Sequence, residues 1–143
     1  MPGATRFEQL TVWQRLHELN VEIWKATVHG AAGRDFRFAN QIRDAADSAA
    51  RNVAEGFGRF NPAEFARFLE ISRASTLEAQ TLLRKGRAVG YLDDQEFGRL
   101  DSLAERGLQA LAKFQRYLRS AQARRNAARR YRPRPNAPND PNV

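Results

Sequence analysis

The two histidines of the chain are the first place to look for metal chemistry. Helical bundles often hold metal ions on repeated Glu-x-x-His motifs, in which the carboxylate and the imidazole share one helix face. The residues three positions before His17 and His29 are Gln14 and Ala26, so this motif is absent. The chain has no Cys, which excludes thiolate ligands, cysteine nucleophiles and disulfides. We therefore expect no metal and no other cofactor.

Hydroxyl side chains gather at one point of the chain, at Ser72, Ser75 and Thr76. A nucleophilic Ser or Thr must lie against a base, and neither His is near these residues in the sequence. None of the 16 acidic residues stands out as part of a catalytic pair. We interpret the hydroxyls as part of a helix–helix contact, and we expect a non-catalytic protein without a small-molecule substrate.

The segment 52–59 is the densest group of unusual residues, because two Gly flank an aromatic residue beside an acid and a base. A phosphate-binding loop would need a longer Gly-rich loop that ends in Gly-Lys-Ser/Thr, and that sequence is missing. One interpretation is a corner at the end of a helix, where Phe57 and Phe60 close the end of the bundle. The other is a partner interface formed by Asn52, Glu55, Gly56, Phe57, Gly58 and Arg59.

Basic residues supply the candidates for nucleic-acid contact. In the second expected helix, charges of alternating sign recur every four residues from Arg43 to Arg59. Such a ladder is typical of a solvated face with ion pairs, although its acids would also order Arg51 and Arg59 for a partner's phosphate or carboxylate. Three further bases near residue 85 fit a binding patch, and the dipole of a helix end explains them equally well. The nucleic-acid candidates are Arg43, Arg51, Arg84, Lys85, Arg87, Arg124, Arg125, Arg129 and Arg130.

The positive charge is concentrated at the C-terminal end of the chain. The net charge is +8, and from residue 122 onward six Arg accompany a single acid, Asp140, which gives this segment +5. A basic tail of this kind indicates polyanionic partners such as RNA or DNA. An Arg- and Ala-rich composition would also follow from a GC-rich genome, and the sequence leaves both explanations open.

Helices are the elements that must position these residues. Apolar residues recur every three or four positions in four segments, and no long stretch alternates with period two. The segments lie near residues 12–27, 38–53, 65–83 and 97–121. We predict an all-α, antiparallel up-down-up-down four-helix bundle over residues 1–121. A disordered, basic and Pro-rich tail is expected over 122–143. No stretch is long and apolar enough for a membrane span, so we expect a cytoplasmic protein.

Local signals predict where these helices begin and end. Gly30 to Gly33 are expected to end the first helix, and Gly90 the third. Asn61 is expected to cap the third helix and Asp93 the fourth. Small residues fill the middle of the second helix from Ala45 to Ala54 and of the third from Ser72 to Thr76. Small side chains let two backbones approach, so we predict a close contact there, with hydroxyls that bond locally to backbone carbonyls.

Several motifs in order resemble one known family over about residues 7–121. They are Phe7 with Leu10, Val12-Trp13-Gln14, Glu18-Leu19, Gln41-Ile42-Arg43, Ala45-Ala46 with Ser48, Asn52 to Arg59, Glu64-Phe65, Arg67-Phe68-Leu69 with Ile71, Ser75, Glu78, and Gly90-Tyr91-Leu92. In these motifs the chain is similar to the helical proteins encoded in intervening sequences of bacterial 23S ribosomal RNA genes. It departs from that pattern at Asp44, where a basic residue is usual, and in its basic Pro-rich tail.

The resemblance implies an antiparallel four-helix bundle and a ring-shaped homopentamer. It also implies a more distant similarity to the accessory protein of diversity-generating retroelements, which binds a reverse transcriptase and nucleic acid. We therefore expect a homo-oligomeric helical adaptor that binds RNA or a ribonucleoprotein through its basic residues. The alternative is a ring that binds only protein, through the 52–59 segment, with no nucleic-acid role.

Overall fold

The computed structural model describes residues 3–59 and 61–130, and every regular element in this part of the chain is a helix. A short 3₁₀ helix, η1, covers Phe7–Gln9. The α-helices are α1 (Thr11–Ala26), α2 (Gly30–Arg34), α3 (Phe36–Phe57), α4 (Pro62–Ala88) and α5 (Asp94–Arg130).

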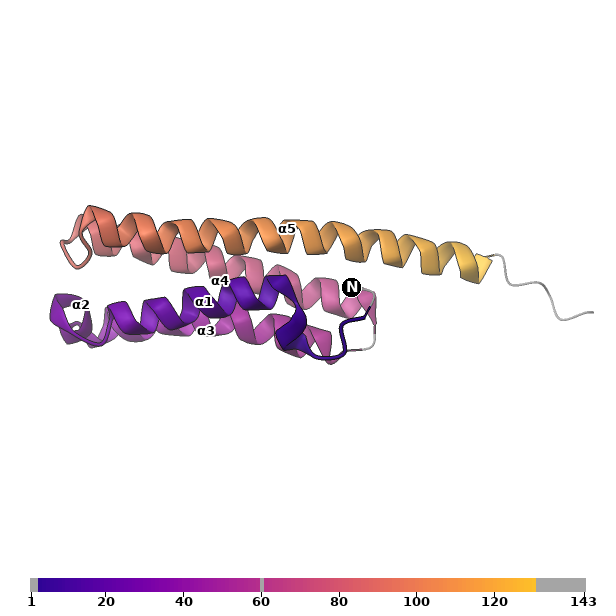
Figure 1. Ribbon diagram of the computed structural model, residues 1–143, viewed down its shortest axis with the longest axis horizontal. Coiled ribbons are helices and arrows are strands. Elements are labelled where there is room, and N and C mark those ends of the chain that lie inside the picture. Colours follow the sequence, from indigo (N-terminus) through magenta and orange to yellow (C-terminus); the bar gives the residue numbers. More distant parts are fainter. Residues whose placement is uncertain (1–2, 60, 131–143) are drawn as a thin grey trace, which may run out of the picture.

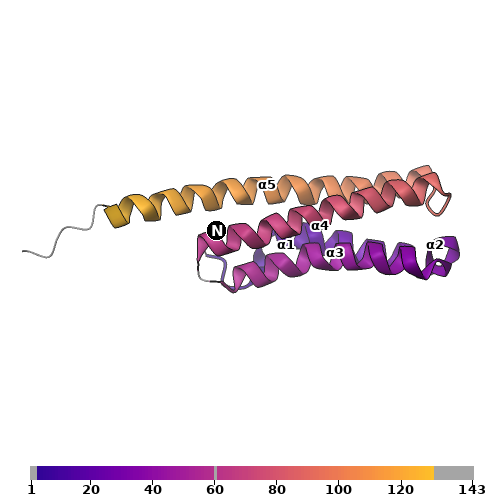
Figure 2. The ribbon, with the colours of Figure 1, turned by 180° about the vertical axis from the view of Figure 1, so that it is seen from behind.

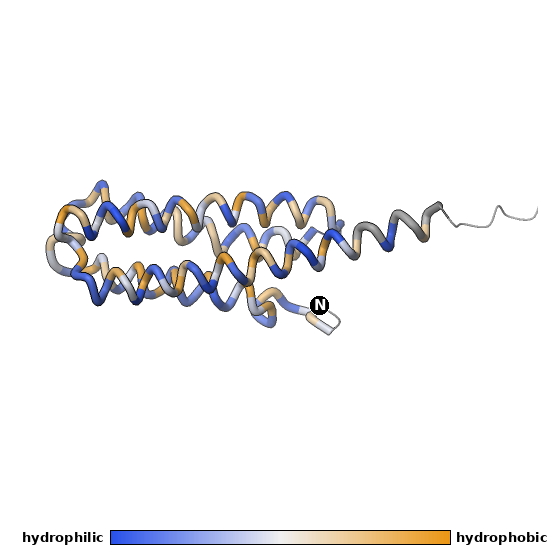
Figure 3. The backbone as a smooth tube through the Cα atoms, turned by 90° about the horizontal axis from the view of Figure 1, so that it is seen from above, coloured by the Kyte–Doolittle hydropathy of each residue, from blue (hydrophilic) through white to orange (hydrophobic). Residues whose placement is uncertain are grey.

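Four long helices lie side by side and alternate in direction along the chain (Figures 1 and 2). Helix α1 packs on α3 and α5, and α4 packs on the same two helices from the other side, so the four contacts close a bundle. The predicted all-α, antiparallel four-helix bundle is confirmed. The apolar positions of each helix recur along its length (Figure 3), and these positions form the core.

The core consists of two apolar clusters, one toward each end of the bundle. Ile23, Ile42 and Leu83 belong to the cluster near α2, and Leu16, Leu69 and Leu111 to the cluster at the other end. All six side chains are almost completely buried. Burial of each contributes about 1.5–3 kcal/mol, so the bundle rests on these two clusters and not on any single charged pair.

Three of the predicted helix boundaries are confirmed. Asn61 caps α4 by accepting a hydrogen bond from the backbone N–H of Ala63 at 2.9 Å, with Pro62 at the first helical position. Asp93 caps α5 by accepting from the N–H of Glu96 at 2.7 Å. Helix α4 ends before Gly90, whose φ of +84° suits the residue that follows a helix C-terminus.

The predicted end of the first helix was wrong by several residues. Helix α1 ends at Ala26, and the segment expected to be its C-terminus forms the separate short helix α2. The Thr27 hydroxyl donates to the carbonyls of Ile23 at 2.9 Å and Trp24 at 3.2 Å. The backbone N–H of Thr27 donates to the same two carbonyls, each at 3.2 Å, so the hydroxyl reinforces a helix end that forms without Gly.

Helix α5 continues to Arg130, past the end at residue 121 that the apolar period predicted. The added residues are mostly Ala and Arg, which favour helix without any apolar face. This part of α5 extends beyond the ends of α1, α3 and α4 (Figure 1). The expected disorder of residues 122–130 is therefore wrong, and the rest of the predicted tail, 131–143, lies outside the described residues.

Candidate interaction surfaces

The close contact between α3 and α4 is confirmed, and its hydroxyls lie between the helices. Ser72 Oγ donates across the contact to the Ala49 carbonyl at 2.6 Å, and the Oγ atoms of Ser48 and Ser75 are 2.7 Å apart. Thr76 alone bonds within its helix, to the Ser72 carbonyl at 2.8 Å. The prediction of local bonding was wrong for Ser72 and Ser75, because the small residues bring the opposite helix close enough for Ser72 to reach its backbone and for Ser75 to reach the Ser48 hydroxyl.

The first part of the 52–59 segment belongs to this contact. Asn52 is 9% exposed, and its Nδ2 donates to the Ser48 carbonyl at 2.8 Å and to Ser48 Oγ at 3.1 Å. Its amide therefore extends the hydroxyl pair of Ser48 and Ser75 into a three-residue network. Asn52 stabilises the bundle here and presents little surface to a partner.

Packing also explains Gly56 and Phe57. A Cβ atom on Gly56 would lie 2.6 Å from Cδ2 of Phe65 and 2.8 Å from Cβ of Phe68. The half-buried Phe57 ring packs edge-on against Phe65, with the ring centroids 6.3 Å apart. The interpretation of Phe57 as a plug at the end of the bundle fits these contacts, whereas Phe60 lies outside the described residues.

Only the end of the segment is exposed. Glu55 and Arg59 form an ion pair at 3.4 Å, and the Arg59 guanidinium lies 5.3 Å from the Phe68 ring centroid. Gly58, the C-cap of α3, is exposed beside them. Of the six predicted interface residues, Glu55, Gly58 and Arg59 are thus available on the surface of the bundle.

The predicted ladder of ion pairs on α3 is largely absent, because two of its residues, Arg43 and Asp47, form hydrogen bonds with α1 and its C-cap residue Thr27. Arg43 donates from Nε to Thr27 Oγ1 and from Nη2 to the Thr27 carbonyl, both at 2.8 Å. Asp47 accepts from Asn20 Nδ2 at 2.7 Å. These contacts use two of the five N–H donors of Arg43. Its guanidinium carbon also lies 4.3 Å from the Trp24 ring centroid, so Arg43 is a poor phosphate ligand.

Arg51 lies on a polar groove between α3 and α4, with a volume of about 410 Å³. The groove is lined by Gln41, Asp44, Ala45, Ser48, Arg51, Ser75 and Glu78. Two carboxylates, those of Asp44 and Glu78, share it with the single guanidinium. The net negative charge of the lining opposes phosphate binding, so Arg51 is also a weak candidate for nucleic-acid contact.

The bases at the end of α4 connect this helix to α5. Arg84 Nη1 lies 3.4 Å from Asp101 Oδ1, and Arg87 Nε lies 2.8 Å from Asp94 Oδ1. The Arg87 guanidinium also lies 4.8 Å from the Phe97 ring centroid. Lys85 is exposed. The structure thus favours the structural interpretation for Arg84 and Arg87 and leaves Lys85 on the surface.

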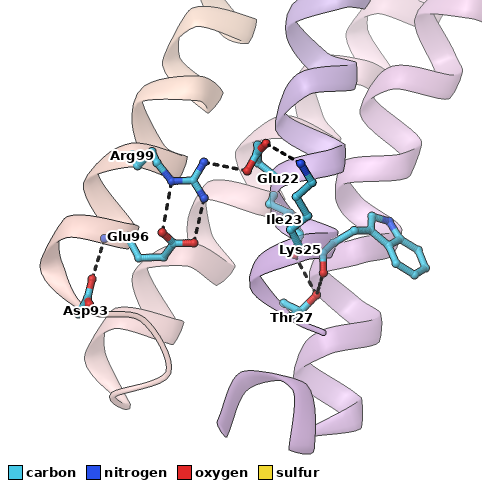
Figure 4. Close-up of polar contacts among 8 residues, drawn as sticks. Glu22, Ile23, Lys25, Thr27, Asp93, Glu96 and Arg99 are labelled. Carbon is cyan, nitrogen blue, oxygen red and sulfur yellow. Dashed lines mark hydrogen bonds and ion pairs between the residues drawn. The ribbon is translucent and has the colours of Figure 1, made fainter. Parts of the chain in front are cut away.

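A charged cluster that the sequence did not predict connects α1 to α5. In Figure 4, Arg99 reaches between Glu96 of its own helix and Glu22 of α1, at 2.9 Å from each carboxylate. The hydrogen bond from Arg99 holds the pKa of Glu22 below its ordinary value. The spacing of Glu96 and Arg99 is a detectable helical signal, whereas the distant Glu22 gives none.

A second unpredicted contact ties the α4–α5 turn to the start of α3. The Tyr91 hydroxyl donates to Asp35 Oδ2 at 2.7 Å, and Asp35 Oδ1 accepts from the N–H of Phe38 at 3.0 Å. These bonds, led by the one from Tyr91, lower the pKa of Asp35. The same bond raises the pKa of the Tyr91 phenol.

The part of α5 from Arg106 to Arg130 carries the largest group of exposed bases, which also includes Arg116 and Arg119. Arg106, Lys113 and Arg124 are exposed, and their spacing of seven and eleven residues places them along one line of the helix. Arg125 is exposed as well. No acid occurs between Glu105 and Asp140. In the described part of the chain, no ion pair includes a base that follows Arg99.

The predicted candidates Arg124 and Arg125 therefore lie together on the projecting part of α5, at the end of the bundle opposite α2 (Figure 1). Arg129 and Arg130 belong to the same helix, but their side chains are outside the part of the chain that the structure describes. Sequence reasoning missed four of these bases: Arg106, Lys113, Arg116 and Arg119. The signal was visible, because the sequence has no acid between Glu105 and Asp140.

Within residues 3–59 and 61–130, no group of three His, Asp or Glu side chains is placed to hold a metal ion. None of the helices in that part combines the length and the apolar character needed to cross a membrane.

Comparison with known proteins places the chain in a family. A model of the 23S rRNA-intervening sequence protein matches residues 8–113. The chain is also similar to a solved structure, which is described as a protein with unknown function from the S23 ribosomal protein family of Bacteroides thetaiotaomicron. The two structures align with a TM-score of 0.66 and 19% sequence identity, over 73% of this chain and 97% of that chain. No curated protein matches. Because the family match spans most of the bundle, the chain belongs to the 23S rRNA-intervening sequence protein family.

Proposed function

We propose that this protein is a non-catalytic, oligomeric adaptor that binds RNA through the part of α5 from Arg106 to Arg130. The observation that carries the proposal is that this part of the helix has many exposed bases and no acid, and that its end projects past the bundle (Figure 1). Most other candidate arginines are engaged within the fold, whereas Arg124 and Arg125 are exposed on this projection. The projection begins after the residues that the family model matches, so it would add a function to the shared fold.

The dimensions of the basic helix suit a phosphate backbone. From Arg106 to Arg124 the helix rises roughly 27 Å at 1.5 Å per residue, which places several positive charges beside successive phosphates. Each phosphate contact releases a bound counterion, and the logarithm of the affinity falls by about 0.7 per contact for each tenfold rise in salt with single strands. Binding would therefore be electrostatic, sensitive to salt and little dependent on base sequence.

Substitution of Arg124 and Arg125 by Gln tests this proposal. The matched control replaces Arg67 and Arg73, which are exposed on α4, so both variants lose two positive charges. We expect the affinity for a labelled RNA to fall at least about tenfold in R124Q/R125Q and to change little in R67Q/R73Q. The slope of log affinity against log salt concentration should become smaller in magnitude by about 1.4 in R124Q/R125Q and stay unchanged in R67Q/R73Q. Equal effects would show that total charge matters and that the α5 site does not exist.

Oligomerisation would multiply these weak contacts, because one bound subunit raises the effective concentration of the next. Support for self-association comes from α4, where Ile71 and Leu77 are 43% and 38% exposed and Ala74 lies exposed between them on the same side of the helix. We propose a homopentamer. Light scattering at micromolar concentration should give about five times the chain mass of 16.3 kDa. The mass of one chain would refute self-association.

A second candidate function is an adaptor for a protein partner alone. It is favoured by the exposed Glu55–Arg59 pair beside Gly58 and by the mixed charges of the neighbouring groove. A charge-reversed double variant, E55R/R59E, should weaken capture of such a partner. This capture should depend on salt much less steeply than RNA binding does.

A further inference from the structure

Two large aromatic side chains are exposed near the α2 end of the bundle. Phe36, at the start of α3, is 77% exposed, and Trp24, near the end of α1, is 41% exposed. The neighbouring Val28 is 54% exposed. Aromatic rings dominate the energetics of core and interface because they bury much apolar surface. Two such rings left in water at one end of a small bundle indicate a binding surface.

One of the rings is part of a rigid stack. The Arg43 guanidinium carbon lies 4.3 Å from the ring centroid of Trp24, within the range of a cation–π contact. The guanidinium is fixed from behind by its two hydrogen bonds to Thr27, each 2.8 Å long. Trp24 is therefore held in place by a positively charged neighbour while much of its surface stays open.

The second ring lies on the same side of α3 as this stack. Phe36 precedes Arg43 by seven residues, and seven residues make almost two turns of an α-helix. The two positions are thus separated by roughly 10 Å along one helix face at 1.5 Å per residue. Bases stack about 3.4 Å apart along a strand, so an extended strand of a few nucleotides would reach from one ring to the other.

The charges around the rings favour an anionic ligand. Between residues 24 and 43 the chain has four bases and one acid. Arg34 and Arg37 are exposed, and Lys25, also exposed, pairs with Glu22 at 3.5 Å. The acid, Asp35, is already bonded to Tyr91 and to the N–H of Phe38. The stack and the exposed bases together match the combination of aromatic platforms and positive charge that binds single-stranded nucleic acid.

We propose that Trp24 and Phe36 form a stacking site for the unpaired bases of single-stranded RNA. This inference rests on the proposed RNA-binding function and adds the class of RNA that the protein selects. The α5 projection at the opposite end would contact phosphates of any RNA, whereas the stacking site needs bases whose faces are free. The protein would accordingly prefer single strands to duplexes.

The test compares three double variants of the full-length chain on a labelled 12-nucleotide single strand and on the duplex of the same length. W24A/F36A removes both rings, W24L/F36L keeps apolar surface without flat rings, and W24F/F36Y keeps the rings. We expect the first two to bind the single strand at least about tenfold more weakly, since each stacked base contributes a factor of about 5 to about 150. W24F/F36Y should bind like the parent, and all variants should bind the duplex like the parent. The single variant F36L, at a mostly exposed position, serves if a double variant does not fold.

Each other outcome overturns the inference in a recognisable way. Retained single-strand binding in W24L/F36L and in F36L would show that stacking makes no contribution. A change in oligomer mass for W24A/F36A, measured by light scattering, would show that the patch is a contact between subunits. If the parent binds single strand and duplex equally and no variant differs, the stacking site is refuted and the α5 proposal stands. If the parent binds neither RNA, both proposals fail.

Discussion

The replacement of Gly56 by Ala tests how closely α3 and α4 approach. An added Cβ would lie 2.6 Å from Cδ2 of Phe65 and 2.8 Å from Cβ of Phe68. The Phe65 ring can rotate by a small amount, but the Phe68 Cβ is fixed to its backbone, so the helices would have to separate. Overpacking of this kind costs about 1–3 kcal/mol.

Helix propensity acts in the opposite direction and must be removed from the comparison. Ala is favoured over Gly by about 0.8–1 kcal/mol inside a helix. Gly98, in α5, supplies the matched control, because a Cβ there would have no heavy atom within 4 Å apart from its chain neighbours and the adjoining backbone of its own helix. We expect G98A to be more stable than the parent by up to about 1 kcal/mol. G56A should be less stable than the parent by about 1 kcal/mol, after subtraction of the propensity gain from the overpacking cost.

The assay is urea unfolding followed by helical ellipticity, at one fixed protein concentration because self-association would shift the midpoint. The difference between the two variants isolates the steric cost and should be about 2 kcal/mol. If G56A is stabilised as much as G98A, the close approach of the helices at this corner is wrong.

Three further substitutions test other parts of the fold. Ala49→Leu should destabilise the bundle by about 2–4 kcal/mol in urea unfolding, since it overpacks the contact between α3 and α4 and displaces the Ser72 hydroxyl. The control Ala63→Leu, at an exposed position, should change stability by less than about 0.5 kcal/mol. If the two variants unfold at the same urea concentration, the close contact between α3 and α4 is refuted. Ser72→Ala should cost about 1 kcal/mol, and an unchanged midpoint would show that its bond across the helices contributes nothing. The folded pKa of Asp35 is lowered, so its contribution to stability is complete above pH of about 4 and is lost as the pH falls through the folded pKa. Tyr91→Phe should lower the stability at neutral pH and reduce the further loss of stability on acidification. If stability falls with decreasing pH as steeply in this variant as in the parent, the hydrogen bond from Tyr91 is not the main cause of the lowered pKa of Asp35.

The helices were predictable because their signals are local. Buried residues such as Leu16, Leu19 and Ile23 repeat at the spacing of one helix face, and the caps at Asn61 and Asp93 depend on neighbours within three residues. The last part of α5, residues 122–130, has no apolar period to mark it, so the same criterion ended the helix too early.

The roles of the charged residues depended on distant neighbours and were therefore less predictable. Arg43 bonds to Thr27, sixteen residues away, in place of the acid four residues away. Arg87 bonds to Asp94 across a turn, and Arg99 bonds to a carboxylate 77 positions earlier in the chain. The sequence provides a set of candidate bases, whereas the packing decides which of them are neutralised and which, such as Arg124, remain exposed.

The salt dependence of RNA binding by the full-length protein tests the central claim most directly. Affinity for a labelled RNA would be measured between 50 and 200 mM salt, with residues 1–121 in parallel. We predict that log affinity of the full-length protein falls linearly with log salt, with a slope steeper than about −2 for at least three phosphate contacts, and that the shorter chain binds more weakly with a smaller slope. No binding, or an affinity that does not depend on salt, would contradict RNA binding through α5 and would favour the adaptor for a protein partner.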